Sequence, residues 1–161
     1  MREMGKGRID FSISQGGAVL KQFVLFTALL LSGSLQASAA LLVVPTTDHP
    51  IVGKWQWTRS ANNCTEVYDY RSDGTIFAIS GAEESSSTYM ISEQPDANGF
   101  YELTAELVKS NGSQDCSDGP PNTDTAPYTI YIRVHKTQPV YMVCPTPSQD
   151  RCVGPFRRVR P

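Results

Sequence analysis

Three polar side chains on one predicted strand are the first candidates for chemistry in this chain. Tyr131, Arg133 and His135 alternate along the sequence, so their side chains share one face of an extended segment. A cation beside a histidine and a phenol suits the binding of an anion. If this face points into a barrel it is a ligand site, and if it points outward it is a solvated surface. The opposite face is the better candidate for the core, because it carries Ile130, Ile132 and Val134.

The chain lacks the residue patterns of common catalytic sites. Its two histidines, His49 and His135, are far apart in sequence, and GxSxG, HExxH and glycine-rich phosphate loops are all absent. Asp115, Asp118 and Asp124 lie together in one loop, but their spacing fits no EF-hand and suits a solvated segment. The sequence therefore predicts a non-enzymatic protein with no cofactor and no metal. An enzyme that uses His135 and Arg133 is the less favoured alternative.

The chain contains four cysteines, Cys64, Cys116, Cys144 and Cys152, all of which follow residue 60. An even number of cysteines in a small exported domain indicates disulfides, here two. A zinc site is disfavoured because the spacings contain no CxxC knuckle.

The first 39 residues have the pattern of an export leader. Lys21 precedes an apolar run from Phe23 to Leu31, and the small residues Ala37-Ser38-Ala39 fit a signal peptidase site. We expect cleavage after Ala39 or Ala40, and translation that starts near Val19. The apolar run is much shorter than the roughly 20 residues of a membrane-spanning helix, so no stable membrane insertion is expected. The predicted location is the bacterial periplasm or the cell exterior.

The mature chain is mildly acidic. Removing residues 1–39 takes away four of the 14 basic and two of the 16 acidic side chains, which leaves a formal net charge of −4. This charge argues against nucleic acid as a partner. Residues 40–50 contain two prolines and a polar middle, so we expect an extended N-terminal arm outside the core. One domain, residues 51–161, follows the arm.

Short runs of aromatic and β-branched residues fill this domain, separated by turn-forming residues such as Ser72-Asp73-Gly74. The alternation predicts an all-β fold, and the aromatic residues Trp57, Tyr70 and Phe77 are among the expected core or pocket lining. Eight strands are predicted, over residues 53–59, 65–71, 75–80, 87–92, 100–109, 128–136, 140–144 and 152–159.

Eight sequential antiparallel strands suit an up-and-down barrel, which leaves no exposed edge. In such a barrel the links after the first, third, fifth and seventh strands share one end, and all four cysteines fall there. The preferred pairing is Cys64 with Cys116 and Cys144 with Cys152. The pairing of Cys64 with Cys152 and of Cys116 with Cys144 stays open.

Gly53-Lys54-Trp55 opens the first strand, and the basic pair Arg157 and Arg158 lies on the last. This arrangement resembles the lipocalin and calycin superfamily of small β-barrels. In that superfamily an arginine from the last strand covers the tryptophan of a GxW motif and closes the base of the barrel. The resemblance implies an eight-stranded barrel with this closure, by either arginine.

Two groups within that superfamily share further features with the chain. Avidin-like proteins also open with GKW, but tryptophans on their later strands wall the biotin pocket, and here the only tryptophans are Trp55 and Trp57. Periplasmic inhibitors of serralysin-type metalloproteases are similar in having a cysteine nine positions after the GxW tryptophan, as Cys64 is. Their N-terminal arm enters the protease cleft, and residues 40–50 correspond to it.

These observations predict an exported, non-enzymatic, lipocalin-like binding protein. Its expected partner is a small apolar ligand inside the barrel or a protein at the rim, and Trp57, Tyr70 and the polar face of Tyr131, Arg133 and His135 are the candidate ligand-binding residues. The alternative is an inhibitor of a protease or other hydrolase that acts through the arm or the disulfide-bearing loops.

Overall fold

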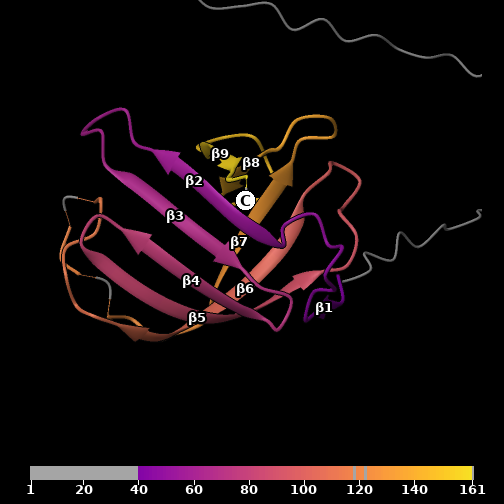
Figure 1. Cartoon of the computed structure of the whole chain (residues 1–161). Helices are drawn as coiled ribbons and strands as arrows, with labels where there is room; N and C mark the ends of the chain where they lie inside the picture. The colour runs from indigo at the N-terminus through magenta and orange to yellow at the C-terminus, as the bar shows by residue number, and fades with distance from the viewer. Residues whose placement is uncertain (1–39, 118, 122, 161) are drawn as a thin grey trace, which may run out of the picture. The chain divides into compact units, whose positions relative to one another are not determined.

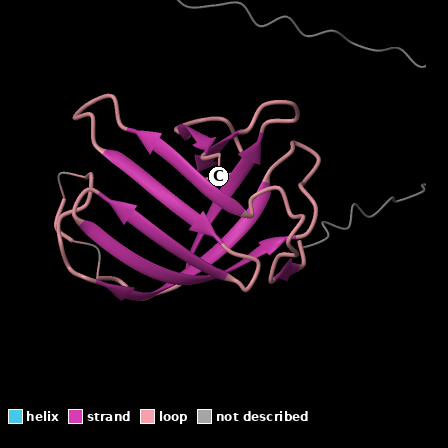
Figure 2. Cartoon of the chain, in the orientation of Figure 1, coloured by secondary structure: helices cyan, strands magenta, loops and turns pink. Residues whose placement is uncertain are grey.

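The computed structural model describes residues 40–117, 119–121 and 123–160, and the predicted leader lies outside them. Figure 2 shows strands and loops in this part of the chain, and no helix is assigned there. The strands are β1 (Leu42–Val43), β2 (Gly53–Thr58), β3 (Thr65–Tyr70), β4 (Thr75–Ser80), β5 (Glu83–Ser92), β6 (Tyr101–Ser110), β7 (Tyr128–Val134), β8 (Val140–Cys144) and β9 (Val153–Arg158).

Strands β2 to β9 close into an eight-stranded antiparallel barrel (Figure 1). The hydrogen-bonded order runs β5-β4-β3-β2-β9-β8-β7-β6, and pairing of β5 with β6 completes the circle. The predicted all-β, up-and-down barrel is therefore confirmed. Closure leaves every strand of the barrel with two neighbours, so the barrel has no free edge.

The structure differs from the prediction at β5, which begins at Glu83 rather than at Ser87. A two-residue turn, Gly81-Ala82, leads directly from β4 into this strand, and Ser80 pairs with Glu83. The run Glu83-Glu84-Ser85-Ser86 lacks the apolar alternation of an ordinary half-buried strand, because its inward positions are polar. Those positions become part of the cavity wall described below.

The N-terminal arm packs on the barrel, contrary to the expectation that it lies outside the core. Strand β1 adds to the end of β5, with Leu42 opposite Ser92. His49 is only 7% exposed, and its Nδ1 accepts a hydrogen bond from the Ile51 amide at 3.3 Å while Nε2 lies 3.3 Å from the Ser92 carbonyl oxygen. The imidazole thus supplies hydrogen-bond partners for backbone groups of Ile51 and Ser92. The two prolines and the polar sequence of the arm give no sign of this packing.

Two disulfides lie at one end of the barrel, as predicted. They join Cys64 to Cys116 and Cys144 to Cys152, which settles the pairing that the sequence left open. We call this end, formed by residues 59–64, 81–82, 111–117, 119–121, 123–127 and 145–152, the disulfide end. Two disulfides indicate that the protein works in an oxidising environment of the extracellular type.

The opposite end, which we call the closed end, is filled by side chains. Trp55 packs edge-on against Tyr141 with ring centroids 4.8 Å apart, and both are about 1% exposed. Around them lie the other members of the buried cluster, Ile51, Tyr70, Ile76, Tyr89, Ile91, Leu103, Ala105, Ile132 and Phe156. Phe77 lies on the outer face of the barrel, contrary to the prediction that it lines the core or pocket. It is 37% exposed, because Ile76 is the buried residue of that pair and sets which face of β4 turns inward.

Arg158 is the arginine that covers the closed end, where the resemblance implied either Arg157 or Arg158. Its guanidinium lies 4.2 Å from the centre of the Trp55 ring and donates hydrogen bonds to the Val52 and Pro50 carbonyl oxygens at 2.8 and 2.7 Å. Gly53 leaves room for it: φ is +129°, and a Cβ there would lie 2.5 Å from Nη1 of Arg158. The GxW spacing is therefore explained by the close approach of the arginine.

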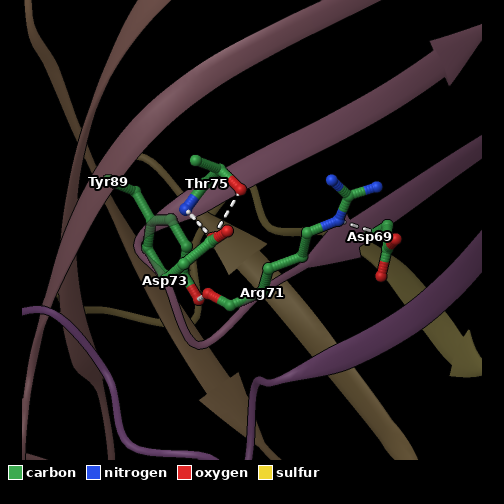
Figure 3. Close-up of polar contacts among 5 residues, drawn as sticks. All are labelled: Asp69, Arg71, Asp73, Thr75 and Tyr89. Atoms are coloured by element: carbon green, nitrogen blue, oxygen red, sulfur yellow. Dashed lines mark hydrogen bonds and ion pairs between the residues drawn. The ribbon is translucent and has the colours of Figure 1, made fainter.

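The turn between β3 and β4, also at the closed end, is the one that Ser72-Asp73-Gly74 predicted (Figure 3). Asp73 accepts hydrogen bonds from the backbone amide and the hydroxyl of Thr75, at 3.0 and 2.6 Å, and these bonds lower the pKa of its carboxyl group. The Tyr89 hydroxyl donates to the Arg71 carbonyl oxygen at 3.0 Å. The turn is thereby tied to β5 as well as to its own strands.

Candidate ligand cavity

A cavity of about 410 Å³ occupies the half of the barrel nearer the disulfide end. Its floor is the buried cluster, through Tyr70, Ile76, Leu103, Tyr141 and Phe156, and its upper wall includes loop residues of the disulfide end. The remaining lining residues are Trp57, Arg59, Glu66, Tyr68, Ala78, Ser80, Glu83, Ser85, Ser87, Leu107, Asp115, Tyr128, Ile130, Val143 and Val153. The barrel is therefore packed at one end and hollow at the other.

One side of the cavity is aromatic. Phe156 contacts Trp57, Tyr68 and Tyr141, with ring centroids 5.4, 5.6 and 4.7 Å apart. The Tyr141 and Phe156 rings are stacked within 6° of parallel. Trp57 and Tyr68 are the half-buried rings of this group, and the nearly buried Phe156 ring holds both in place from behind.

Two carboxyl groups also line the cavity, and one of them, Glu66, is the cross-strand partner of Trp57. Glu66 on β3 and Glu83 on β5 are 9% and 8% exposed, respectively. The Tyr68 hydroxyl donates to Glu66 Oε2 at 2.8 Å, and the Ser110 hydroxyl donates to Glu83 Oε1 at 2.8 Å. Each carboxyl group therefore has one neutral donor that fixes its orientation, and neither has an ion-pair partner among the described residues.

Burial raises the pKa of the Glu66 carboxyl group. The loss of water around this carboxyl group raises its pKa, against the lowering effect of the Tyr68 hydrogen bond and of the positive charge on Arg59. The negative charges of Asp115 and Glu83 raise the pKa further. A carboxylate in this position is stabilised by any additional positive charge that enters the cavity.

Arg59 and Asp115 add charge near the mouth. The Arg59 side chain donates to the Cys116 carbonyl oxygen at 3.0 Å, and its guanidinium lies 5.9 Å from the centre of the Trp57 ring. Asp115 accepts hydrogen bonds from the Ser117 amide and hydroxyl at 2.8 and 2.6 Å. Arg59 is therefore held by the loop that carries Cys116. The lining residues include one arginine and three carboxyl groups, so their net charge is −2 when all three carboxyl groups are ionised.

The structure places the candidate residues from the sequence in two locations. Trp57 and Tyr70 line the cavity. Arg133 and His135 lie on the outer surface, where the Arg133 guanidinium is 5.6 Å from the Phe100 ring centre and His135 Nδ1 accepts bonds from two backbone amides. Tyr131 lines a different surface depression from the one shared by Arg133 and His135. The outward alternative is thus the one observed, because Ile132 faces the core and is fully buried.

Sequence reasoning missed Glu66 and Glu83 as lining residues. Glu66 could have been predicted to line the cavity, because it alternates with Tyr68 and Tyr70 along one strand and therefore shares their inward face. Glu83 carries none, since its segment was not recognised as a strand. No set of three or more His, Cys, Asp or Glu side chains in the described part of the chain is arranged to hold a metal ion, and Asp118 lies outside that part.

Comparisons with known proteins give no further guide to the site. No protein-family model matches the chain, and neither curated protein sequences nor solved structures show a significant similarity to it. Among the described residues, no helix has the length and apolar character needed to span a membrane.

Proposed function

We propose that this protein is an exported, lipocalin-like carrier or receptor that binds a small organic molecule in the barrel cavity. The observation that carries the proposal is the cavity itself. Its volume of about 410 Å³ lies within the range of small-molecule sites, and its walls combine aromatic surface with a few oriented polar groups, as such sites do. The Arg158–Trp55 closure supports the likeness to lipocalins.

Export is part of the same proposal. The disulfides suit an oxidising compartment, and residues 21–39 have the pattern of a cleavable leader. Both observations support a periplasmic or extracellular location. A binding protein there meets its ligand outside the cytoplasm.

The alternative is an inhibitor that acts through its N-terminal arm or its disulfide-bearing loops, and the arm version draws less support from the structure. Residues 42–43 are paired with β5, and His49 is buried against the same barrel. Insertion of this segment into the cleft of another protein requires that these contacts break first. We therefore favour the cavity over the arm.

The test uses N-phenyl-1-naphthylamine, a neutral dye that fluoresces in apolar surroundings. Ala78 lines the cavity, and the next residue on the same strand, Ile79, is 39% exposed. The variant Ala78→Trp places an indole inside the cavity, and Ile79→Trp places one on the outer surface as the matched control. We expect saturable dye binding to the wild type and to Ile79→Trp, and loss of at least 10-fold in affinity in Ala78→Trp.

Two results contradict the proposal. One is the absence of saturable binding by folded wild-type protein. The other is equal binding by the two tryptophan variants, which places the dye outside the barrel. Near-ultraviolet circular dichroism of each variant shows whether the barrel has folded.

A further inference from the structure

The cavity is lined by two buried carboxyl groups, neither of which forms an ion pair within the described part of the chain. Glu66 and Glu83 are both more than nine-tenths buried and both line the cavity. The single ion pair among the described residues joins Arg71 to Asp69 and is elsewhere. Burial of an ionised carboxyl group without a close charged partner is unfavourable, and the Arg59 charge acts on Glu66 without forming an ion pair with it, so a further positive charge in the cavity would stabilise both groups.

The strand register brings these two carboxyl groups to one place. Glu66 pairs with Ser80 on β4, and Ser80 pairs with Glu83 on β5, so the three residues form one row across three strands. Two strand spacings of about 4.8 Å put the Cα atoms of the two glutamates roughly 10 Å apart. Ser80 lies between them and its hydroxyl oxygen accepts a hydrogen bond from the Cys116 amide at 3.0 Å, so a group that contacts both carboxyl groups has to lie on the cavity side of Ser80.

The rest of the cavity suits the remainder of such a ligand. Trp57, Tyr68 and Phe156 provide aromatic faces, which attract cations as well as apolar groups. The only cation in the lining, Arg59, is bonded to the Cys116 carbonyl oxygen near the mouth. The interior thus offers negative charge and π surface together.

We propose that the ligand is an organic cation, an amine whose ammonium group lies between Glu66 and Glu83 and whose apolar or aromatic body packs on Trp57 and Phe156. This inference rests on the proposed function, because it names the chemical class that the same cavity takes. An ammonium group supplies up to three donors, which matches two carboxylates on one row. An anion is disfavoured by the net charge of the lining, and a neutral ligand leaves both carboxylates unpaired.

The experiment compares an amine with its neutral counterpart by isothermal titration calorimetry. The probes are tryptamine and tryptophol, which share the indole and differ in the terminal amine or hydroxyl group. At pH 7 we expect wild-type protein to bind tryptamine at least 10-fold more tightly than tryptophol. Charge-assisted hydrogen bonds of ordinary strength account for a preference of this size.

Three variants locate the preference. Glu66→Gln and Glu83→Gln keep the shape and hydrogen-bonding capacity of the side chains but remove their charge, and each is expected to lower tryptamine affinity by about 10-fold without lowering tryptophol affinity. Glu84→Gln is the matched control, because Glu84 is exposed and follows Glu83 on the same strand. Its tryptamine affinity is expected to equal that of the wild type.

The outcomes separate this inference from the proposed function. Equal binding of the two probes, or unchanged tryptamine binding in both cavity variants, overturns the organic-cation ligand while dye binding still supports a ligand cavity. Failure of both tryptamine and the neutral dye to bind the folded wild type overturns both.

Discussion

Replacement of Arg158 tests the closure of the barrel. The Arg158→Ala variant loses a cation–π contact at 4.2 Å, worth about 1 kcal/mol, and two hydrogen bonds from a charged donor, each worth about 1.5 kcal/mol. Arg158 lies at the surface, where water competes for the guanidinium, so we expect a net loss of about 2 to 3 kcal/mol in the free energy of unfolding. Arg158→Lys keeps the charge but lacks the planar fork, and we expect it to lose about 1 to 2 kcal/mol.

Urea unfolding followed by near-ultraviolet circular dichroism measures these changes. Arg157→Ala is the matched control, because Arg157 is the exposed neighbour on β9, and its substitution is expected to change the free energy of unfolding by less than about 0.5 kcal/mol. Gly53→Ala reaches the same contact from the other side, since the added Cβ displaces the Arg158 guanidinium. Equal stability of the Arg158→Ala and Arg157→Ala variants refutes the reasoning.

Three further predictions concern buried groups and cross-links. Burial lowers the pKa of His49 in the folded protein, so the unfolded chain takes up the proton first as the pH falls. We therefore expect the free energy of unfolding to decrease below about pH 6.5. A His49→Gln variant with the same pH dependence contradicts this. Burial raises the pKa of Glu66, so its ionised form destabilises the folded protein at pH 7. Glu66→Gln is therefore expected to stabilise the ligand-free protein at pH 7 and to lose this advantage below about pH 4.5. Lower stability of this variant at pH 7 contradicts the prediction. The Cys64–Cys116 disulfide closes a sequence separation of 52, so its replacement by two alanines is expected to lower the unfolding free energy by about 4 kcal/mol, and a loss below about 1 kcal/mol argues against that role.

The barrel was predictable from sequence because its strands carry local signals. Ser72-Asp73-Gly74 marks a tight turn, and the alternation of Ile130 and Ile132 with polar residues marks a half-buried strand. The position of the cysteines at one end followed from the parity of the strand links. These features depend on residues that are close together in sequence, so they can be recognised in one sequence alone.

The cavity was only partly predictable, for a physical reason. Alternation identifies an inward face by its apolar residues, and the inward face of β5 begins with Glu83, Ser85 and Ser87. A strand that lines a polar cavity therefore resembles a loop in sequence. The burial of His49 likewise depends on contacts with the Ser92 region, which lies 43 residues away in the chain.

The proposed function requires that a small molecule binds inside the barrel at the disulfide end. The most direct measurement is the set of nuclear Overhauser effects between bound N-phenyl-1-naphthylamine and methyl groups of isotope-labelled protein. Leu107 and Ile130 line the cavity, whereas Ile79 is partly exposed and absent from its lining. We predict contacts from the dye to the methyl groups of Leu107 and Ile130 and none to Ile79. Contacts to Ile79 without any to Leu107 or Ile130 contradict the claim.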